Sequence, residues 1–441
     1  MSNNKVIKNA SWIIGCKIVQ SLLGVVISMF TARYLGPANF GLINYASSVT
    51  AFLLPIAQLG LNDILVQETI AHQEEEGKIF GTALILSLCS AVLCMLGCFT
   101  FVSFANAGEK DTIIVCCLYS IVLIGQVLEM IQYWYQAKYL SKYVSIVALL
   151  AYVVVSAYKV YLLVTEKNVN WFALSNAIDY FLIGILLIIL YKRLGCQRFA
   201  FSGSVAKRIL NKSRFYVFPN MMVTLFAQTD KIMLKLMLDE TATGLYSAAV
   251  TSASLTSFVF SAIIDSFRPV IFESQKESVE AFEKNVTKLY AIVIYLSLLQ
   301  CVGMTVLAKP IIGILYGSNY DASAQALQII VWYTTFSYLG AVRNIWILGN
   351  AKQQYLWIIN LSGALANVVL NAMLIPLMGI NGAALASLAT QIFTNVIMVW
   401  IIAPIRHSNT LMVRALNPKI IARIVKTVRA LEKLTVRFLR K

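Results

Sequence analysis

The sequence predicts an all-α polytopic membrane protein with twelve transmembrane helices in two six-helix lobes. Its composition is the first reason, because 59% of the 441 residues are hydrophobic and only 13% are charged, whereas soluble domains carry roughly 25% charged residues. Twelve apolar runs are the second reason, since each has the approximately 20 residues that a membrane span needs. The third reason is a turn motif that recurs in the second half of the chain with similar flanking helices.

The predicted spans are residues 11–33, 40–62, 80–104, 112–134, 143–165, 171–191, 215–238, 244–265, 286–309, 323–348, 355–377 and 381–403. The first run is too long for the apolar region of a signal peptide and lacks a small-residue cleavage site, so it is interpreted as a span. The seventh run is the weakest, because it carries Asp230, Lys231 and Lys235. Its place in the repeat is the reason to retain it.

The repeat relates two turns that lie 203 residues apart. At that offset Leu35 matches Leu238, Gly41 matches Gly244, Leu42 matches Leu245 and Ala46 matches Ala249. The polar face formed by Lys17, Ser21, Gly24 and Ser28 is matched by Asn220, Thr224, Ala227 and Lys231. A second face, Asn44, Ser48, Ala51, Pro55, Gln58 and Asn62, is matched by Ser247, Thr251, Ser254, Phe258, Ser261 and Asp265. The spacing places each set on one side of a helix. Coincidence among small residues, which helix contacts in lipid also favour, is the alternative.

Positive charge sets the predicted orientation. Lys and Arg concentrate in the even-numbered connections, so both termini are expected to be cytoplasmic. An even number of spans in each half gives the two halves the same orientation, which requires a pseudo-twofold axis along the membrane normal. The predicted organisation is an N-terminal lobe at residues 1–191, a basic cytoplasmic linker at 192–214, a C-terminal lobe at 215–404 and a basic amphipathic cytoplasmic tail at 405–441.

The tail holds much of the net charge of +16. Ten Lys or Arg and one acid lie between Arg406 and Lys441, which gives this segment +9. Asn417-Pro418 is typical of a helix start, and apolar residues then recur at helical spacing among basic ones. This pattern predicts an interfacial helix that binds anionic lipids rather than nucleic acid. A helix that docks on a partner protein is the alternative.

Ionisable groups inside the spans are costly and therefore indicate a transport path. The predicted substrate cavity is lined by Lys17, Ser21, Ser28, Asn44, Ser48, Lys159, Thr224, Gln228, Lys231, Lys235, Thr251, Asn367 and Arg343. Such a cavity is rich in hydrogen-bonding groups and positively biased, which suits a large polar anion. The candidate residues for ion coupling are Asp179, Asp230, Asp265 and Glu129. Several of these charges have an alternative interpretation. Lipid headgroups would solvate Asp265, whereas Arg343 and Glu129 would snorkel to the membrane surface. Lys231 would form an ion pair with Asp179 or Asp230.

No cofactor, metal or enzyme chemistry is indicated. The eight cysteines form no CxxC pair and the two histidines lie far apart, so a zinc site is not expected. No GxxxxGK[ST] motif and no Ser/His/Asp constellation is present. Transport is therefore expected to use an ion gradient or the gradient of the substrate.

Four motifs carry a family resemblance. They are Tyr34-Leu-Gly-Pro-x-x-Phe-Gly-Leu-x-x-Tyr-Ala46, Leu59-Gly-Leu61, Thr229-Asp-Lys-Ile-Met233 and Gly244-Leu-Tyr-Ser-Ala-Ala249. With these motifs the chain resembles the Wzx-type bacterial polysaccharide flippases, which export O-antigen and related repeat units. They belong to the multidrug/oligosaccharidyl-lipid/polysaccharide exporter superfamily.

The resemblance implies a MATE-like V of two lobes around a cavity lined mainly by helices 1, 2, 7 and 8. It implies that undecaprenyl-diphosphate-linked oligosaccharide moves from the inner to the outer leaflet of the bacterial cytoplasmic membrane. Lys17, Lys231 and Lys235 would contact the diphosphate and sugar. Coupling to H⁺ or Na⁺ would involve Asp179 or Asp230. With twelve spans, the chain lacks the extra helix pair of the lipid II flippase branch.

The resemblance also sets the candidate partners and leaves two rival functions. The candidate protein partners are a polysaccharide polymerase and a chain-length regulator. The first rival is a MATE-type ion-coupled drug or cation antiporter, which would favour an acidic, aromatic cavity. The second is a scaffold for glycan assembly, which has no reason to keep charges inside the membrane.

Overall fold

The computed structural model describes residues 3–194 and 196–422, with the backbone alone for residues 3–14, 17, 18 and 22. Every regular element in these residues is a helix, which confirms the all-α prediction. Contacts divide the chain into two compact units. The first is Met1–Ser247 with Leu315–Asn319, and the second is Ala248–Ile314 with Tyr320–Lys441.

The first unit is built from nine α-helices and the start of a tenth. These are α1 (Asn3–Ala57), α2 (Leu65–Ala71), α3 (Glu76–Ala105), α4 (Lys110–Ser120), α5 (Val122–Glu129), α6 (Gln132–Ala137), α7 (Ser141–Val164), α8 (Val169–Arg193), α9 (Gly203–Met237) and α10 (Glu240–Ala253). Two short 3₁₀ turns, η1 (Leu61–Asp63) and η2 (Gln73–Glu75), flank α2. Many of the polar residues described below lie on four of these helices, α1, α3, α7 and α9.

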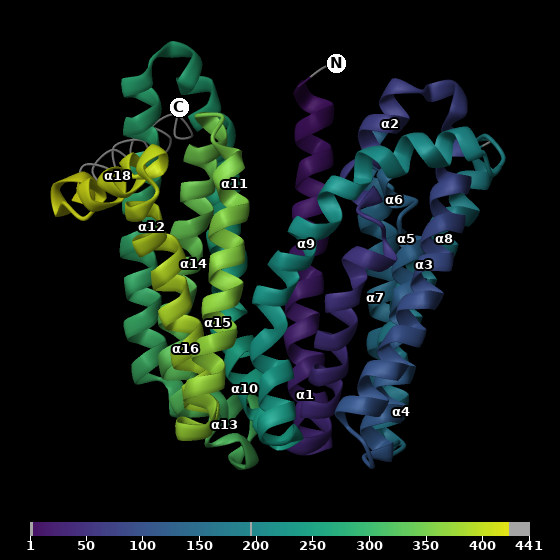
Figure 1. The fold of residues 1–441 in the computed structure, drawn as a ribbon, viewed down its shortest axis with the longest axis horizontal. Coiled ribbons are helices and arrows are strands. Elements are labelled where there is room, and N and C mark those ends of the chain that lie inside the picture. Colours follow the sequence, from purple (N-terminus) through teal and green to yellow (C-terminus); the bar gives the residue numbers. More distant parts are fainter. Residues whose placement is uncertain (1–2, 195, 423–441) are drawn as a thin grey trace, which may run out of the picture. The chain divides into compact units, whose positions relative to one another are not determined.

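Helix α1 is two helices joined at Gly36, where the backbone has φ 69° and ψ 172°. A positive φ costs glycine little because it has no Cβ, so Gly36 is suited to the sharp turn between the first two predicted spans. Within this unit α1 packs against α3, α4, α7 and α9, and Figure 1 shows α9 in teal running beside α1 in purple. The buried core includes Phe80, Tyr135 and Tyr191.

The second unit continues from Ala248. It contains η3 (Ser254–Thr256), α11 (Ser257–Glu277), α12 (Val279–Val306), most of α13 (Ala308–Tyr316), α14 (Ser323–Gly349), η5 (Gln353–Tyr355), α15 (Leu356–Met378), α16 (Ile380–Ile392), the π-helix η6 (Phe393–Ile397), α17 (Met398–Ile401), η7 (Ala403–Ile405) and α18 (His407–Ala415). The turn η4 (Ser318–Tyr320) lies at the boundary of the units. Helix α14 packs against α12 and α16, around a core that includes Tyr290 and Trp346.

Nine helical segments of the described residues are long and apolar enough to cross a membrane. The stretch Val19–Ala57 counts once, although Gly36 divides it into two helices. Helices α9 and α14 occupy the seventh and tenth predicted positions but are not among the nine. The protein is therefore a multi-pass membrane protein by length and composition, while the count of twelve spans, the lobe boundaries and the cytoplasmic termini stay predictions.

The structure corrects the start of the seventh helix. Helix α9 begins at Gly203, not at Phe215, so most of the predicted linker 192–214 is helical. Val205 and Ile209 are fully buried in the core of the first unit. The basic residues of this segment occupy the remaining faces, and their number obscured the apolar face in the sequence.

The predicted tail also differs from the structure at its beginning. Residues 407–415 form α18, which packs on α12 with Leu411 and Ala415 buried. Ser408 Oγ lies 2.9 Å from Tyr290 Oη. A new helical turn starts after Asn417, whose Oδ1 accepts a hydrogen bond of 3.0 Å from the Lys419 amide, as expected of an N-cap. The rest of the predicted amphipathic helix, residues 423–441, lies outside the described part of the chain.

Candidate functional site

The second half of α1 and α9 share a polar contact that links two predicted cavity residues. Ser48 Oγ lies 2.9 Å from Gln228 Oε1 and 2.8 Å from the Asn44 carbonyl oxygen. The Asn44 side chain in turn donates to the Phe40 carbonyl at 2.9 Å. The two predicted polar faces therefore meet at this point.

The first half of α1 meets the polar face of α7. A Cβ added at Gly24 would lie only 2.9 Å from Tyr152 Oη, so glycine makes room for the phenol. Ser21 is exposed and Ser28 is half-buried. Lys17 lies on α1, but its side chain is outside the described part of the structure.

Three half-buried ionisable residues, Glu129, Lys159 and Asp179, lie on α5, α7 and α8, respectively. Lys159 Nζ donates to Asn176 Oδ1 at 3.1 Å, and it attracts the carboxylate of Asp179. Asp179 Oδ1 is buried without a hydrogen-bond partner among the described residues. Glu129 lies on α5, which packs against α8. A role of Asp179 and Glu129 in ion coupling stays a prediction.

Lys235 is held by two carboxylates. Its side chain is 3% exposed, and Nζ lies 2.7 Å from Glu109 Oε2 and 2.8 Å from Glu240 Oε2. Burial raises the pKa of the Glu109 carboxyl, but hydrogen bonds from Lys235 and Thr112 lower it more, so the net pKa is below its usual value. The charge of Lys235 is thus neutralised within the protein.

Lys231 differs from Lys235. Its side chain is half-buried, and no acid lies within 4.0 Å of its ammonium among the described residues. The neighbouring Asp230 is buried and accepts a hydrogen bond of 2.5 Å from Tyr246 Oη. The expected ion pair of Lys231 with Asp179 or Asp230 is therefore not formed at contact distance.

Four predicted site residues, Thr251, Asp265, Arg343 and Asn367, belong to the second unit. Arg343 is buried, and its guanidinium donates to Asn395 Oδ1 at 2.9 Å, to the Thr394 carbonyl at 3.1 Å and to Asn344 Oδ1 at 2.9 Å. It does not snorkel. Its partners Thr394 and Asn395 lie on the π-helix η6, a distortion that is frequent at functional sites.

Three further predicted residues of this unit have simple environments. Asn371 Nδ2 donates to Asn367 Oδ1 at 3.1 Å, and both side chains are fully buried. Thr251 is half-buried on α10. Asp265 is exposed and lies 3.3 Å from Arg268, one turn further along α11.

A pocket of about 220 Å³ opens within the first unit, where the end of α1 faces α9. Its polar lining consists of Gln58, Asn62, Asn220 and Thr224. Asn62 donates to Gln58 Oε1, and Asn220 Nδ2 donates to Asp63 Oδ2 at 2.8 Å. Asn62 Oδ1 is buried without a partner among the described residues. The polar face of residues 44–62 in the first repeat and that of residues 220–231 in the second thus contribute to one concave surface.

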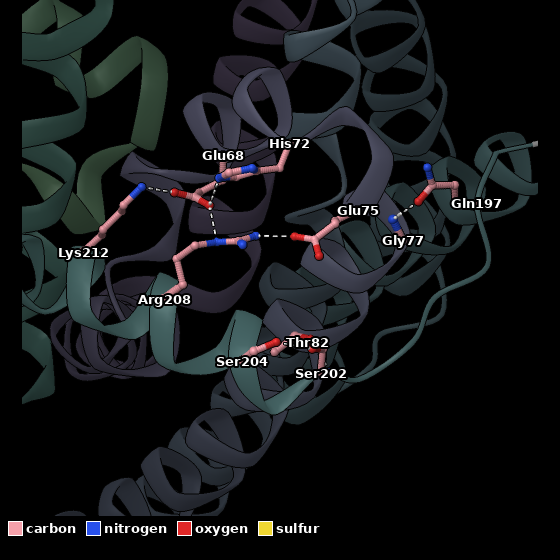
Figure 2. Close-up of polar contacts among 10 residues, drawn as sticks. All are labelled: Glu68, His72, Glu75, Gly77, Thr82, Gln197, Ser202, Ser204, Arg208 and Lys212. Atoms are coloured by element: carbon pink, nitrogen blue, oxygen red, sulfur yellow. Dashed lines mark hydrogen bonds and ion pairs between the residues drawn. The ribbon is translucent and has the colours of Figure 1, made fainter.

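A clasp of Glu68, Glu75, Arg208 and Lys212 fixes the first turns of α9 (Figure 2). Glu68 is 2% exposed, and it lies 3.1 Å from Arg208 Nε and 2.5 Å from Lys212 Nζ. The same guanidinium reaches Glu75 at 2.8 Å. Burial of Glu68 is tolerated because two cations share its charge.

The chain that leads to α9 is also held along α3. Gln197 Oε1 accepts a hydrogen bond from the Gly77 amide at 3.0 Å, and the Ser202 amide donates to Thr82 Oγ1 at 3.0 Å. A Cβ at Gly77 would lie 2.3 Å from the Arg198 carbonyl oxygen, so glycine is needed for this close approach. The segment predicted as a linker is therefore fastened to the first unit.

The sequence analysis missed the partners of the charged residues. These are Glu68, Glu109, Glu240, Asn176 and Asn395. Each acid stands near the end of an apolar run, just outside the predicted spans. Charge balance was the one available signal, because basic residues such as Arg208 and Lys235 need partners once they are buried.

Comparisons with known proteins agree with this architecture. A model of the family described as "Polysaccharide biosynthesis protein" matches residues 6–275. No curated protein sequence matches the chain. Among solved structures, the inward closed conformation of the lipid II flippase MurJ has a TM-score of 0.72 and 13% identity, covering 92% of this chain and 90% of that one.

Two MATE transporters are also similar. An inward-facing multidrug resistance transporter of the MOP superfamily has a TM-score of 0.64 and 14% identity over 89% of this chain and 96% of that one. The eukaryotic transporter AtDTX14 has a TM-score of 0.61 and 16% identity over 93% and 99%. At these identities the likeness shows the fold, which is that of MurJ and the MATE transporters. These relatives are transport proteins rather than enzymes, in agreement with the expectation from sequence.

Proposed function

Because this chain belongs to the polysaccharide biosynthesis protein family, we propose that it is a flippase for lipid-linked oligosaccharides. Its substrate is an undecaprenyl-diphosphate-linked repeat unit, which moves from the inner to the outer leaflet of the bacterial cytoplasmic membrane by alternating access. The product serves surface polysaccharide synthesis, as O-antigen, capsule or exopolysaccharide. Two six-helix lobes, twelve spans and cytoplasmic termini are part of this proposal.

One observation supports it above the others. Lys231 is an intramembrane cation without an ion pair at contact distance in the described residues. Such charges are expensive in lipid unless a ligand or cavity water compensates them. A diphosphate group provides the missing negative charge. Lys235 and Arg343, by contrast, already have partners, so we now assign them to positioning rather than to the diphosphate.

Ion coupling is assigned to the cluster of Lys159, Asp179 and Glu129. Two like charges near one cation cannot both stay ionised in a low-dielectric site without cost. A proton or Na⁺ that enters this cluster changes its charge, which can shift the balance between two conformations of the protein. Asp265, which is exposed and paired with Arg268, is a weaker candidate.

The test uses a strain that lacks the gene. Its undecaprenyl-linked intermediates would be extracted and assigned to a leaflet. We expect complete repeat units to accumulate on the cytoplasmic side while the surface polysaccharide is lost. An unchanged pool of lipid-linked intermediates would contradict the proposal and favour a MATE-type antiporter.

A further inference from the structure

We propose that the pocket between the end of α1 and α9 binds one uncharged monosaccharide unit of the transported glycan. The source of the sugar rests on the function proposed above, but sugar binding itself does not. The pocket has the size and the hydrogen-bonding groups that such a ligand requires, and its lining contains no Lys or Arg. The helix α9, which forms one wall, is held by ion pairs near its start.

Uncommitted hydrogen-bonding groups are the first argument. Asn62 uses its Nδ2 on Gln58 and leaves its buried Oδ1 without a partner among the described residues. Asn220 likewise uses its Nδ2, on Asp63. The remaining amide oxygens accept hydrogen bonds, and the Gln58 amide nitrogen donates them. A sugar hydroxyl both donates and accepts, so several hydroxyls can satisfy this mixed set at once.

The size and the apolar side of the pocket are the second argument. Its volume of about 220 Å³ is below the roughly 300–1,000 Å³ of pockets that enclose drug-sized ligands, which suits a single ring. Gly60 and the apolar residues Leu54, Pro55 and Val223 complete the lining. They offer an apolar surface for the C–H face of a pyranose, while the amides face its hydroxyls.

Charge is the third argument, and it selects against acidic sugars. The lining contains no Lys or Arg, and the carboxylate of Asp63 lies against Asn220. The nearest basic residues on α9 towards its N-terminus are engaged elsewhere, since Arg214 is exposed and lies 4.7 Å from the centre of the Phe215 ring, and Lys212 is paired with Glu68. A uronic acid would therefore meet a carboxylate without a compensating cation, whereas a neutral or N-acetylated sugar would not.

The clasp in Figure 2 holds the start of α9, the helix that supplies one wall of the pocket, against α2. Glu68 on α2 pairs with Arg208 and Lys212, which lie about three turns and two turns before Asn220 on α9. At Gly60, which lines the pocket, a Cβ would lie 2.6 Å from the Ser213 carbonyl oxygen. The two walls are thus in close contact at this point.

The binding test uses the purified full-length protein in detergent. Saturation-transfer-difference NMR would be recorded with glucose, galactose, mannose, rhamnose, N-acetylglucosamine and N-acetylgalactosamine as separate probes, and with glucuronate as the acidic counterpart. We expect transfer to at least one neutral sugar, weaker transfer to glucuronate, and loss in Asn62→Leu and Asn220→Leu. Asn211→Leu is the matched control, since Asn211 is an exposed amide on the same helix outside the pocket.

The same variants in cells separate this proposal from the proposed function. When the wild-type gene restores surface glycan to a deletion strain, the flippase function stands. Asn62→Leu and Asn220→Leu should then each lower glycan export about tenfold. This is the effect of losing about one hydrogen bond when its partner is left without another. Asn211→Leu should not lower export. No saturation transfer from any neutral sugar, or equal transfer in wild type and Asn62→Leu, would overturn the pocket assignment while leaving the flippase function intact.

A variant with a bulky side chain tests whether loss of sugar binding is caused by misfolding. Thr224→Trp fills the pocket from α9 without removing an amide. It should abolish saturation transfer and leave the elution volume of the protein in size-exclusion chromatography unchanged. Sugar binding at wild-type strength in a folded Thr224→Trp protein would place the sugar elsewhere and overturn the proposal.

Discussion

Gly41 and Gly244, which match at the 203-residue offset, lie face to face in the structure. A Cβ at Gly41 would lie 1.8 Å from the Glu240 carbonyl oxygen, and a Cβ at Gly244 would lie 1.9 Å from the Pro37 carbonyl oxygen. The equivalent turns of the repeat thus approach through their backbones. Small residues permit such close helix contacts in membranes, and reciprocal contact is what a twofold relation between the repeats predicts.

The first prediction concerns this crossing. Gly41→Ala and Gly244→Ala should each destabilise the protein by about 1–3 kcal/mol or more, because the backbones must separate to admit a methyl group. Thermal unfolding in detergent would measure it. Gly97→Ala on α3 is the control, since a Cβ there meets nothing within 4 Å and alanine favours a helix over glycine. Equal stability of Gly41→Ala and Gly97→Ala would mean that the crossing is not tight.

The second prediction concerns the two carboxylates around Lys235. The double variant Glu109→Gln/Glu240→Gln should lose about 3–5 kcal/mol of stability, because it leaves a buried ammonium without a counter-charge. Adding Lys235→Met should restore much of the loss. Chemical denaturation of the double and triple variants would decide it, and a triple variant less stable than the double would contradict the assignment.

The carboxylate of Glu109 makes the stability of the folded protein depend on pH, in a direction that can be predicted. The pKa of Glu109 is lower in the folded protein than its usual value, so its contribution to stability is fully present above about pH 4.3, the pKa of a free Glu. That contribution is lost as the pH falls through the lower pKa of the folded state. In Glu109→Gln the acid-induced loss of stability should be smaller, and an unchanged pH profile in that variant would contradict the pairing.

The third prediction concerns the clasp. Glu68→Gln should destabilise the start of α9 by about 1–3 kcal/mol, a value below that of a fully buried pair because Arg208 and Lys212 are partly exposed. Limited trypsin digestion should then cut faster at these two basic residues. Glu74→Gln, which changes an exposed side chain on the neighbouring turn η2, is the control and should digest at the wild-type rate.

The fourth prediction separates the two lysines of α9. Lys231→Ala should abolish glycan export while the protein folds and inserts normally, because its ammonium makes no ion pair with the part of the chain that the structure describes. Export would be measured as surface polysaccharide in a complemented deletion strain, with Lys207→Ala, an exposed lysine at the start of α9, as the control. Normal surface glycan with Lys231→Ala would remove Lys231 from the substrate site.

The sequence predicted the fold class and the polar faces because both follow from periodicity. Apolar runs of about 20 residues define membrane helices, and the spacing of Ser48 and Gln228 placed them on the faces that meet in the structure. The glycine match at the turns likewise identified two segments that touch.

Partners and boundaries could not be predicted in the same way. Which acid binds Lys235 depends on where a loop and a helix end lie in space, and Glu109 is 126 residues away in the sequence. The start of α9 was misplaced because a helix that is basic on several faces looks like a cytoplasmic loop. Only packing of Val205 and Ile209 against the first unit makes it helical.

Translocation by the purified protein is the most direct test of the flippase account. Proteoliposomes would carry undecaprenyl-diphosphate-linked oligosaccharide in one leaflet only. The oligosaccharide would contain galactose or N-acetylgalactosamine, so that a membrane-impermeant oxidase of that sugar detects the oligosaccharide once it reaches the other leaflet. We expect transfer that depends on the protein, that is lost with Lys231→Ala and that is retained with Lys207→Ala. Transfer no faster than in protein-free liposomes, with the protein folded and inserted, would contradict the account.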